Sequence, residues 1–136
     1  MPGAPAAGTA QPVVLHIEDN PANRRLMQQI FRLRKDLALR EADSAESGLD
    51  LARRVAPALI LMDINLPGMD GFAALEVIQR DPRTAHIPVI AISANAMKGD
   101  RERGLESGFV DYLTKPLDVP WFLGRLDDLL AGKGKP

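Results

Sequence analysis

The sequence predicts a doubly wound α/β domain, in which helices cover both faces of a parallel sheet. Short apolar runs alternate with segments of helical periodicity, giving five strands and five helices in alternation. The runs lack a regular polar alternation, which is typical of strands buried on both faces. Four of them end in polar residues of the kind that gather at the carboxyl edge of such a sheet. Right-handed crossovers are expected between successive strands.

The first unit is a strand at Val13–Ile17 followed by a helix. Asn20 is a favoured N-cap residue, and Pro21 suits the first helical position because no N–H partner is needed there. Apolar residues then repeat with the period of a helix, at Leu26, Met27, Ile30 and Phe31. Arg24 and Arg25 lie off this stripe and are interpreted as solvated charges, with a partner contact as the alternative.

The second unit is a strand near Leu37–Glu41 and a helix that Ser44 can cap. Its expected apolar positions are Leu49, Leu51, Ala52 and Val55. The third strand is the run Ala58–Met62, which ends in Asp63. A turn follows, and the third helix opens at Asp70-Gly71 with apolar positions at Phe72, Leu75, Val77 and Ile78. Asp81-Pro82 ends it, because a residue before proline avoids the helical conformation.

The fourth and fifth units differ in their expected stability. The run Val89–Ile92 ends in Ser93, and the segment Ala94–Ser107 that follows has few large apolar residues. Gly99 and Gly104 weaken this helix further. The fifth strand, Val110–Thr114, ends in Lys115. The last helix is stronger, because its apolar residues follow the i, i+3, i+4, i+7 pattern. They are Val119, Phe122, Leu123, Leu126, Leu129 and Leu130.

Bulk properties exclude several classes of protein. The chain has 136 residues, which suits one domain with a single core. Its net charge of −1 gives no reason to expect nucleic acid or an anionic membrane as a partner. It has no cysteine, which excludes disulfides and thiolate chemistry. No apolar stretch has the length of a membrane span, and no signal peptide is recognisable, so a cytoplasmic protein is expected.

Composition divides the chain into a domain with two short ends. Residues 1–12 are rich in Pro, Gly and Ala and are expected to form a disordered arm. Residues 13–131 form the domain, and residues 132–136 form a tail that is expected to fray. We find no internal repeat and no second domain.

The polar strand ends predict one site. Glu18, Asp19 and Asp63 bring together negative charges whose repulsion a divalent cation would relieve, and oxygen ligands that meet a phosphate favour Mg²⁺. Lys115 adds a point charge suited to phosphate, and Ser93 can donate a hydrogen bond to a phosphoryl oxygen. A carboxylate in these surroundings is suited to attack phosphorus. His16 and His86 have no metal-ligand partner at a useful spacing and are interpreted as structural.

Four motifs carry a resemblance to a known family. They are Glu18-Asp19, the stretch from Asp63 to Gly71, Ser93-Ala94 and Lys115-Pro116. In this order they resemble the motifs of the receiver domain of bacterial two-component response regulators, and the similarity covers Val13 to about Leu130. The resemblance implies a flavodoxin-like fold, a (βα)5 arrangement whose parallel strands lie in the order 2-1-3-4-5.

The resemblance also implies residue roles. Asp63 would be the phosphoacceptor, with Asp19, Asp63 and the backbone carbonyl of Asn65 as direct Mg²⁺ ligands. Glu18 would act mainly through water, and Ser93 and Lys115 would bind the phosphoryl group. Tyr112 matches the family's rotating aromatic switch, although plain core packing is the alternative. The Lys115-Pro116 peptide would be cis. Two departures are mild: Glu18 stands where Asp is common, and Ser93 where Thr is common.

The partners follow from the same resemblance. The phosphoryl donor would be a phosphohistidine on a histidine kinase or a histidine phosphotransfer protein. Because no effector domain follows the last helix, the expected output is a changed binding surface for a downstream protein, formed by the fourth helix, the fifth strand and the fifth helix. Trp121 lies off its helix's apolar stripe and either anchors a partner or folds over the neighbouring loop.

Three alternatives remain open at this point. The chain could be a receiver from a hybrid histidine kinase. It could be a phosphatase with an aspartyl nucleophile, but that class needs a second Asp two residues after the nucleophile, where this chain has Asn65. It could also be a degenerate receiver that only docks, yet the acceptor, the lysine and the acid pair are all present.

Overall fold

A computed structural model describes residues 11–94, 97 and 99–132, and these residues form a five-stranded parallel sheet. The strand order is β2-β1-β3-β4-β5, as the resemblance implies. The strands are Val13–Ile17 (β1), Ala38–Ala42 (β2), Leu59–Asp63 (β3), Val89–Ser93 (β4) and Asp111–Thr114 (β5). The expected arm at residues 1–12 lies mostly outside the described residues, and so does the expected tail apart from Gly132.

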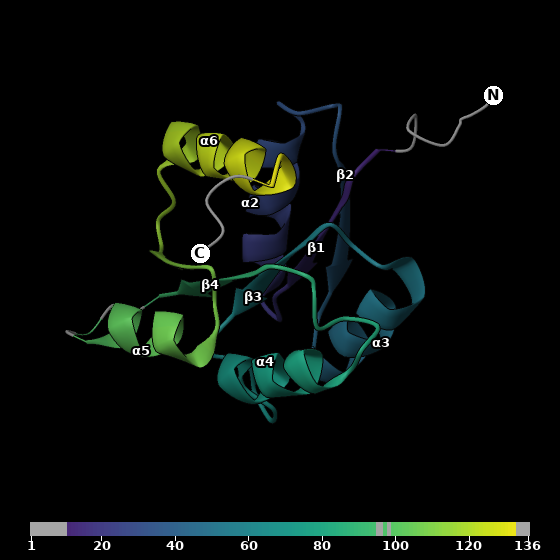
Figure 1. Cartoon of the computed structure of the whole chain (residues 1–136). Helices are drawn as coiled ribbons and strands as arrows, with labels where there is room; N and C mark the ends of the chain where they lie inside the picture. Colours follow the sequence, from purple (N-terminus) through teal and green to yellow (C-terminus); the bar gives the residue numbers. More distant parts are fainter. Residues whose placement is uncertain (1–10, 95–96, 98, 133–136) are drawn as a thin grey trace.

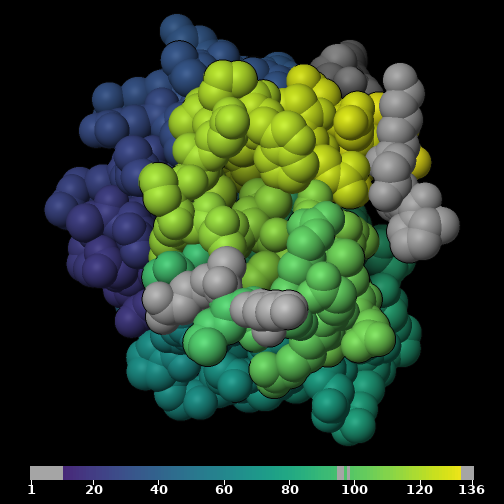
Figure 2. All heavy atoms as spheres, turned by 90° about the vertical axis from the view of Figure 1, so that its left-hand side faces the viewer, coloured from purple at the N-terminus to yellow at the C-terminus, as the bar shows by residue number. Residues whose placement is uncertain are grey.

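Helices cover both faces of the sheet (Figure 1). They are Pro21–Phe31 (α2), Ala45–Val55 (α3), Gly71–Arg80 (α4), Asp100–Ser107 (α5) and Val119–Leu130 (α6). In Figure 1, α2 and α6 lie on one side of the sheet and α3 and α4 on the other. Figure 2 shows α5 and α6 on one face of the molecule, with the chain around β5 between them.

The sheet separates two apolar cores, and β3 contributes to both. Leu59 and Leu61 pack with residues of α2 and α6, whereas Ile60 and Met62 pack with residues of α3 and α4. These four residues are fully buried. Successive strand residues point to opposite faces, so a strand covered on both sides is apolar throughout. The continuous run that ends in Asp63 is therefore explained by its central place in the sheet.

Side-chain caps begin four of the five described helices. Asn20 accepts hydrogen bonds from the backbone N–H groups of Ala22 and Asn23, as expected for an N-cap. Ser44, Asp70 and Asp118 accept in the same way at the starts of α3, α4 and α6. The described part of α5 has no such cap, because Gly99 precedes it with a φ of 90°. The helix that the sequence predicted to be least stable is therefore also the one whose described start lacks a side-chain cap.

The structure corrects some positions of the predicted elements. The second strand is Ala38–Ala42, one residue later than expected. Leu26 and Val77 were assigned to apolar stripes but are 54% and 36% exposed. The stripe of α2 is narrower than predicted, because Met27, Ile30 and Phe31 already fill its contact with the sheet. Within the described residues, no helix is both long and apolar enough to cross a bilayer.

Candidate functional site

The predicted site residues meet at the carboxyl edge of the sheet. Ile17 is the register partner of Met62, so Glu18 and Asp63 follow side by side at the ends of β1 and β3. Ser93 ends β4 opposite Thr114, which places Lys115 one residue beyond the end of β5. Parallel pairing therefore gathers residues from four separate segments of the chain. The topology explains why these four strands end in polar residues.

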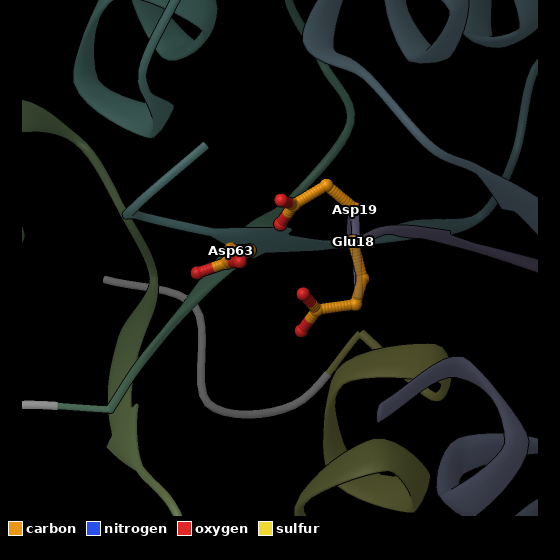
Figure 3. Close-up of side chains that lie close together, drawn as sticks. All are labelled: Glu18, Asp19 and Asp63. Atoms are coloured by element: carbon orange, nitrogen blue, oxygen red, sulfur yellow. The ribbon is translucent and has the colours of Figure 1, made fainter. Parts of the chain in front are cut away.

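The three acids form a close cluster (Figure 3). Glu18, Asp19 and Asp63 each offer one carboxylate oxygen, and these atoms lie within 4.8 Å of one another. Glu18 and Asp63 are buried, whereas Asp19 is exposed. Such a set of oxygen donors, open to solvent on one side, suits a small divalent cation that keeps some of its water. Among the residues that the structure describes, this is the cluster of side chains that could hold a metal ion.

Electrostatics divide the two buried acids. Burial raises the pKa of Asp63 to about 6, and the neighbouring Glu18 adds to this effect, although a hydrogen bond from Asn65 N–H to Asp63 Oδ1 at 3.0 Å opposes it. Burial would also raise the pKa of Glu18, but hydrogen bonds from Lys115 and from Asn20 N–H outweigh it and lower that pKa. Asp63 therefore carries the unrelieved repulsion of the cluster, which a divalent cation would relieve.

Lys115 reaches the cluster directly. Its Nζ lies 2.8 Å from Oε1 of Glu18, and the Lys115-Pro116 peptide is cis, as the resemblance implies. Ser93 is 2% exposed at the end of β4. An ammonium and a hydroxyl thus stand at the edge that carries the carboxylates. Together they supply the donors that a phosphoryl group on an acid would need.

The loop after β3 folds closely over the site. Gly71 begins α4 so near to β3 that an added Cβ would lie 2.9 Å from the carbonyl oxygen of Asp63 and 2.9 Å from Cα of Ile64. Gly68 has a φ of 75°, which a glycine adopts without strain. Asp70 caps α4 through the N–H of Ala73 at 2.9 Å. The two glycines and the cap therefore return the chain tightly to the sheet beside Asp63.

Tyr112 is buried with 6% exposure, and its ring packs against α5. A Cβ added at Gly104 would lie 2.5 Å from Cδ2 of Tyr112. Gly104, which we interpreted as weakening the helix, is therefore also the position that lets the ring approach α5. The predicted switch role of Tyr112 stays a prediction.

Sequence reasoning missed two contacts. Arg24 was expected to be a solvated charge, but its Nη1 donates to the backbone carbonyl of Glu18 at 2.7 Å and so supports the loop that carries the acids. His16 is a buried core residue, as interpreted, and its Nδ1 lies 2.7 Å from Oε2 of Glu41. No local sequence pattern predicts either contact. Arg24 of α2 reaches back to the end of β1, and His16 of β1 meets Glu41 of the neighbouring strand β2.

Comparisons with known proteins agree with this geometry. The family model of the response regulator receiver domain matches residues 14–127. The polar-differentiation response regulator DivK of Brucella anthropi is 39% identical over 118 residues, which cover 87% of this chain and 95% of that protein. These matches span nearly the whole described domain.

Solved structures add the fold and one bound metal. The receiver domain of the sensor histidine kinase PA1611 from Pseudomonas aeruginosa has a magnesium ion coordinated in its active site cleft. It matches with a TM-score of 0.80 and 31% identity, over 90% of this chain and 99% of that one. A response regulator structure from Chloroflexus aurantiacus has a TM-score of 0.82 at 24% identity, over 90% and 99% of the two chains, which supports the fold alone. The chain belongs to the family of response regulator receiver domains.

Proposed function

We propose that Asp63 is the phosphoacceptor of this receiver domain and takes its phosphoryl group from a phosphohistidine. The observation that carries the proposal is the placement of Asp63, 5% exposed, within one cluster with Glu18 and Asp19. Lys115 and Ser93 stand at the same sheet edge. A carboxylate oxygen that attacks phosphorus needs charge neutralisation and orientation more than it needs an additional base.

Mg²⁺ is the cofactor that we assign to the acid cluster. Asp19, Asp63 and the backbone carbonyl of Asn65 would hold it directly, and Glu18 would contribute mainly through water. When bound, the ion would neutralise negative charge on the carboxylates and on the phosphoryl oxygens. The ammonium of Lys115 binds one phosphoryl oxygen as a point charge, and the hydroxyl of Ser93 donates a hydrogen bond to another phosphoryl oxygen.

The donor protein is proposed to dock beside α2. A hollow of about 290 Å³ lies next to the acid cluster and is bordered by Leu26, Met27, Leu117 and Lys115. Leu26 is 54% exposed although it belongs to a structured helix. A histidine kinase or a histidine phosphotransfer protein must bring its phosphohistidine to Asp63, so an apolar surface at this opening fits its contact.

The output surface is proposed to comprise the fourth and fifth helices of the chain, α5 and α6, together with β5. Tyr112 lies buried between β5 and α5, and Trp121 is 51% exposed on α6. A movement of Ser93 toward the phosphoryl group would alter the space beside Tyr112 and hence the position of α5 against β5. The protein would thus act in the cytoplasm as a signalling phosphoacceptor that catalyses only its own phosphorylation and slow dephosphorylation.

A phosphoryl-donor assay tests this function. With acetyl phosphate and Mg²⁺, the protein should take up one phosphoryl group and lose it slowly. Continuous turnover would instead indicate an aspartyl phosphatase, a class that the comparisons do not support, and no labelling would indicate a docking module. Ranking the transfer rates from candidate phosphohistidine donors would then identify the kinase. It would also separate a free-standing regulator from a receiver of a hybrid histidine kinase, whose own kinase would be the fastest donor.

A further inference from the structure

Asp111 is a buried carboxylate outside the acid cluster. It begins β5 at the edge of the sheet and is 3% exposed. Its Oδ1 accepts hydrogen bonds at 2.9 Å from Nη1 of Arg101 and at 2.9 Å from the backbone N–H of Tyr112. Its Oδ2 accepts one at 2.8 Å from Nε of Arg125. A buried charge is costly unless it is paired, so these donors stabilise the ionised form of Asp111.

The two arginines come from different helices. Arg101 belongs to α5 and Arg125 to α6, and Figure 2 shows the chain around β5 between these helices. Burial would raise the pKa of Asp111, but the hydrogen bonds from Arg125, from Tyr112 N–H and from Arg101 outweigh it and lower that pKa. Asp111 is therefore an anion throughout the neutral range, and it joins both helices to the edge strand.

Apolar packing holds α5 much less than it holds α6. Gly104 is the buried residue of α5, and Leu105 is 39% exposed. By contrast, α6 buries Phe122, Leu126 and Leu129. Two further contacts of α5 are polar or partly exposed: Arg103 lies 4.2 Å over the ring of Phe72, and Gln79 donates to the carbonyl of Ser107 at 3.1 Å. A charge-assisted contact therefore accounts for a larger share of the position of α5 than of α6.

Arg101 also attaches α5 to the backbone of the residue next to Asp111. The same Nη1 that binds Asp111 donates to the carbonyl oxygen of Tyr112 at 3.1 Å. The ring of Tyr112 meanwhile packs against Gly104, one turn further along α5. One guanidinium thus fixes the start of the helix to the strand, and the ring fixes its middle.

We propose that Asp111 is a positioning residue that, through Arg101, holds α5 against Tyr112 and so sets the resting form of the output surface. Arg125 holds the carboxylate in place from the side of α6. That the surface is the output surface rests on the function proposed above, whereas the clamp is a property of the unphosphorylated protein. Loss of the clamp should free α5 selectively, without loosening the central strands.

Hydrogen exchange of the unphosphorylated protein tests the clamp. In Arg101→Met, the amides of α5 should exchange roughly fivefold faster, the value for one charge-assisted contact of a half-exposed arginine. Amides of β1 should change less than about twofold, because global unfolding is barely affected. Arg125→Met is the matched control, since it removes the other arginine and leaves Arg101 on the carboxylate. Its effect on α5 should be smaller than that of Arg101→Met.

A double-mutant cycle shows whether Arg101 acts through Asp111. Asp111→Asn should also speed exchange in α5, and the double variant should exceed the larger single effect by little, because both changes break the contact between Arg101 and Asp111. Two independent effects that multiply in the double variant would overturn the proposal. So would unchanged α5 exchange in Arg101→Met, or equal acceleration in α5 and β1. If Asp111→Asn does not fold, the comparison of Arg101→Met with Arg125→Met still decides.

Failure of the clamp can be told from failure of the proposed function. Arg101→Met should be labelled by acetyl phosphate and Mg²⁺ to the same extent as the parent, because Arg101 contacts Asp111 and Tyr112 rather than the acid cluster. A parent that is not labelled would overturn the phosphoacceptor assignment whatever α5 does. A labelled parent whose α5 exchange ignores Arg101 would overturn the clamp alone.

Discussion

Nζ of Lys115 lies 2.8 Å from Oε1 of Glu18, a residue 97 positions earlier in the chain. The pair joins the end of β1 to the loop after β5, and the lysine side chain is 26% exposed whereas that of Glu18 is 2% exposed. The side chain of Glu18 has one methylene more than an aspartate would have, which lengthens its reach toward the lysine. The ammonium is thus held at the acid cluster, where a phosphoryl group on Asp63 would meet it.

Replacing Lys115 should separate phosphorylation from its consequence. In Lys115→Ala, Glu18 loses its cation, and we expect a loss of about 1–2 kcal/mol in unfolding free energy, because the pair is partly exposed. The response of α5 to phosphorylation should be reduced more strongly than the stability of the fold. Beryllofluoride with Mg²⁺, a phosphoryl mimic, should change α5 hydrogen exchange in the parent but hardly in the variant. A variant whose α5 responds as fully as the parent's would contradict the role of Lys115.

Asp63→Asn should abolish stable phosphorylation while preserving the fold. The amide is nearly isosteric with the carboxylate but cannot form an acyl phosphate. Mass spectrometry after incubation with acetyl phosphate and Mg²⁺ should show one added phosphoryl group on the parent and none on the variant. Asp19→Asn serves as a control for the metal, since it keeps the acceptor and should lower labelling rather than abolish it. Equal labelling of parent and Asp63→Asn would refute the assignment.

The same substitution should have a pH-dependent effect on stability. The folded pKa of Asp63 is about 6, above its ordinary value of 3.8, so its contribution to stability is fully present below pH 3.8 and is lost as the pH rises through 6. The unfolding free energy of Asp63→Asn, relative to that of the parent, should therefore rise by on the order of 1 kcal/mol between pH 4 and pH 7. Urea unfolding without divalent cations at both pH values measures this gain. A difference between the two proteins that stays constant with pH would contradict it.

Mg²⁺ should bind at the acid cluster and perturb it first. Titration followed by amide chemical shifts should move Glu18, Asp19, Asp63 and Asn65 before other residues, with saturation at millimolar concentrations. Asp19→Asn should weaken binding by about tenfold or more, because it removes one charged ligand. Glu46→Gln, which removes an acid on α3, should leave the titration unchanged. No saturable change in the parent would count against the metal site.

Two glycines in helices should respond oppositely to alanine. Gly104→Ala places a Cβ about 2.5 Å from the ring of Tyr112, so we expect a loss of about 1–3 kcal/mol and a displaced ring. Gly124→Ala on α6 meets nothing within 4 Å, and removing a flexible glycine there should add about 0.5–1 kcal/mol. Chemical denaturation gives both values, and the NMR signals of Tyr112 report its ring. Similar stability changes in both variants would show that ring packing is not the cause.

Much of this protein was determined by local features of its sequence. The apolar runs, the caps at Asn20, Ser44 and Asp70 and the order of the elements predicted the strands and helices, because buried strands and helix ends impose local requirements on composition. The polar residues at four strand ends predicted the site, because parallel strands end at a common edge. Boundaries shifted by one residue at β2, β3 and β5, and the helix expected within Ala94–Ser107 is described from Asp100, because residue patterns mark the middle of an element better than its ends.

Tertiary structure alone decided how the charges are paired and which apolar residues are covered. Lys115 could have been assigned to a phosphate from its motif, but its contact with Glu18 depends on two chain segments meeting across the sheet edge. In the sequence, Asp111 is an ordinary polar residue at the start of a strand. Only the packing of two helices places Arg101 and Arg125 against its carboxylate. Leu26 has the spacing of a core residue, yet its exposure depends on how far the helix is rotated against the sheet. Such contacts join residues far apart in sequence, and no local propensity encodes them.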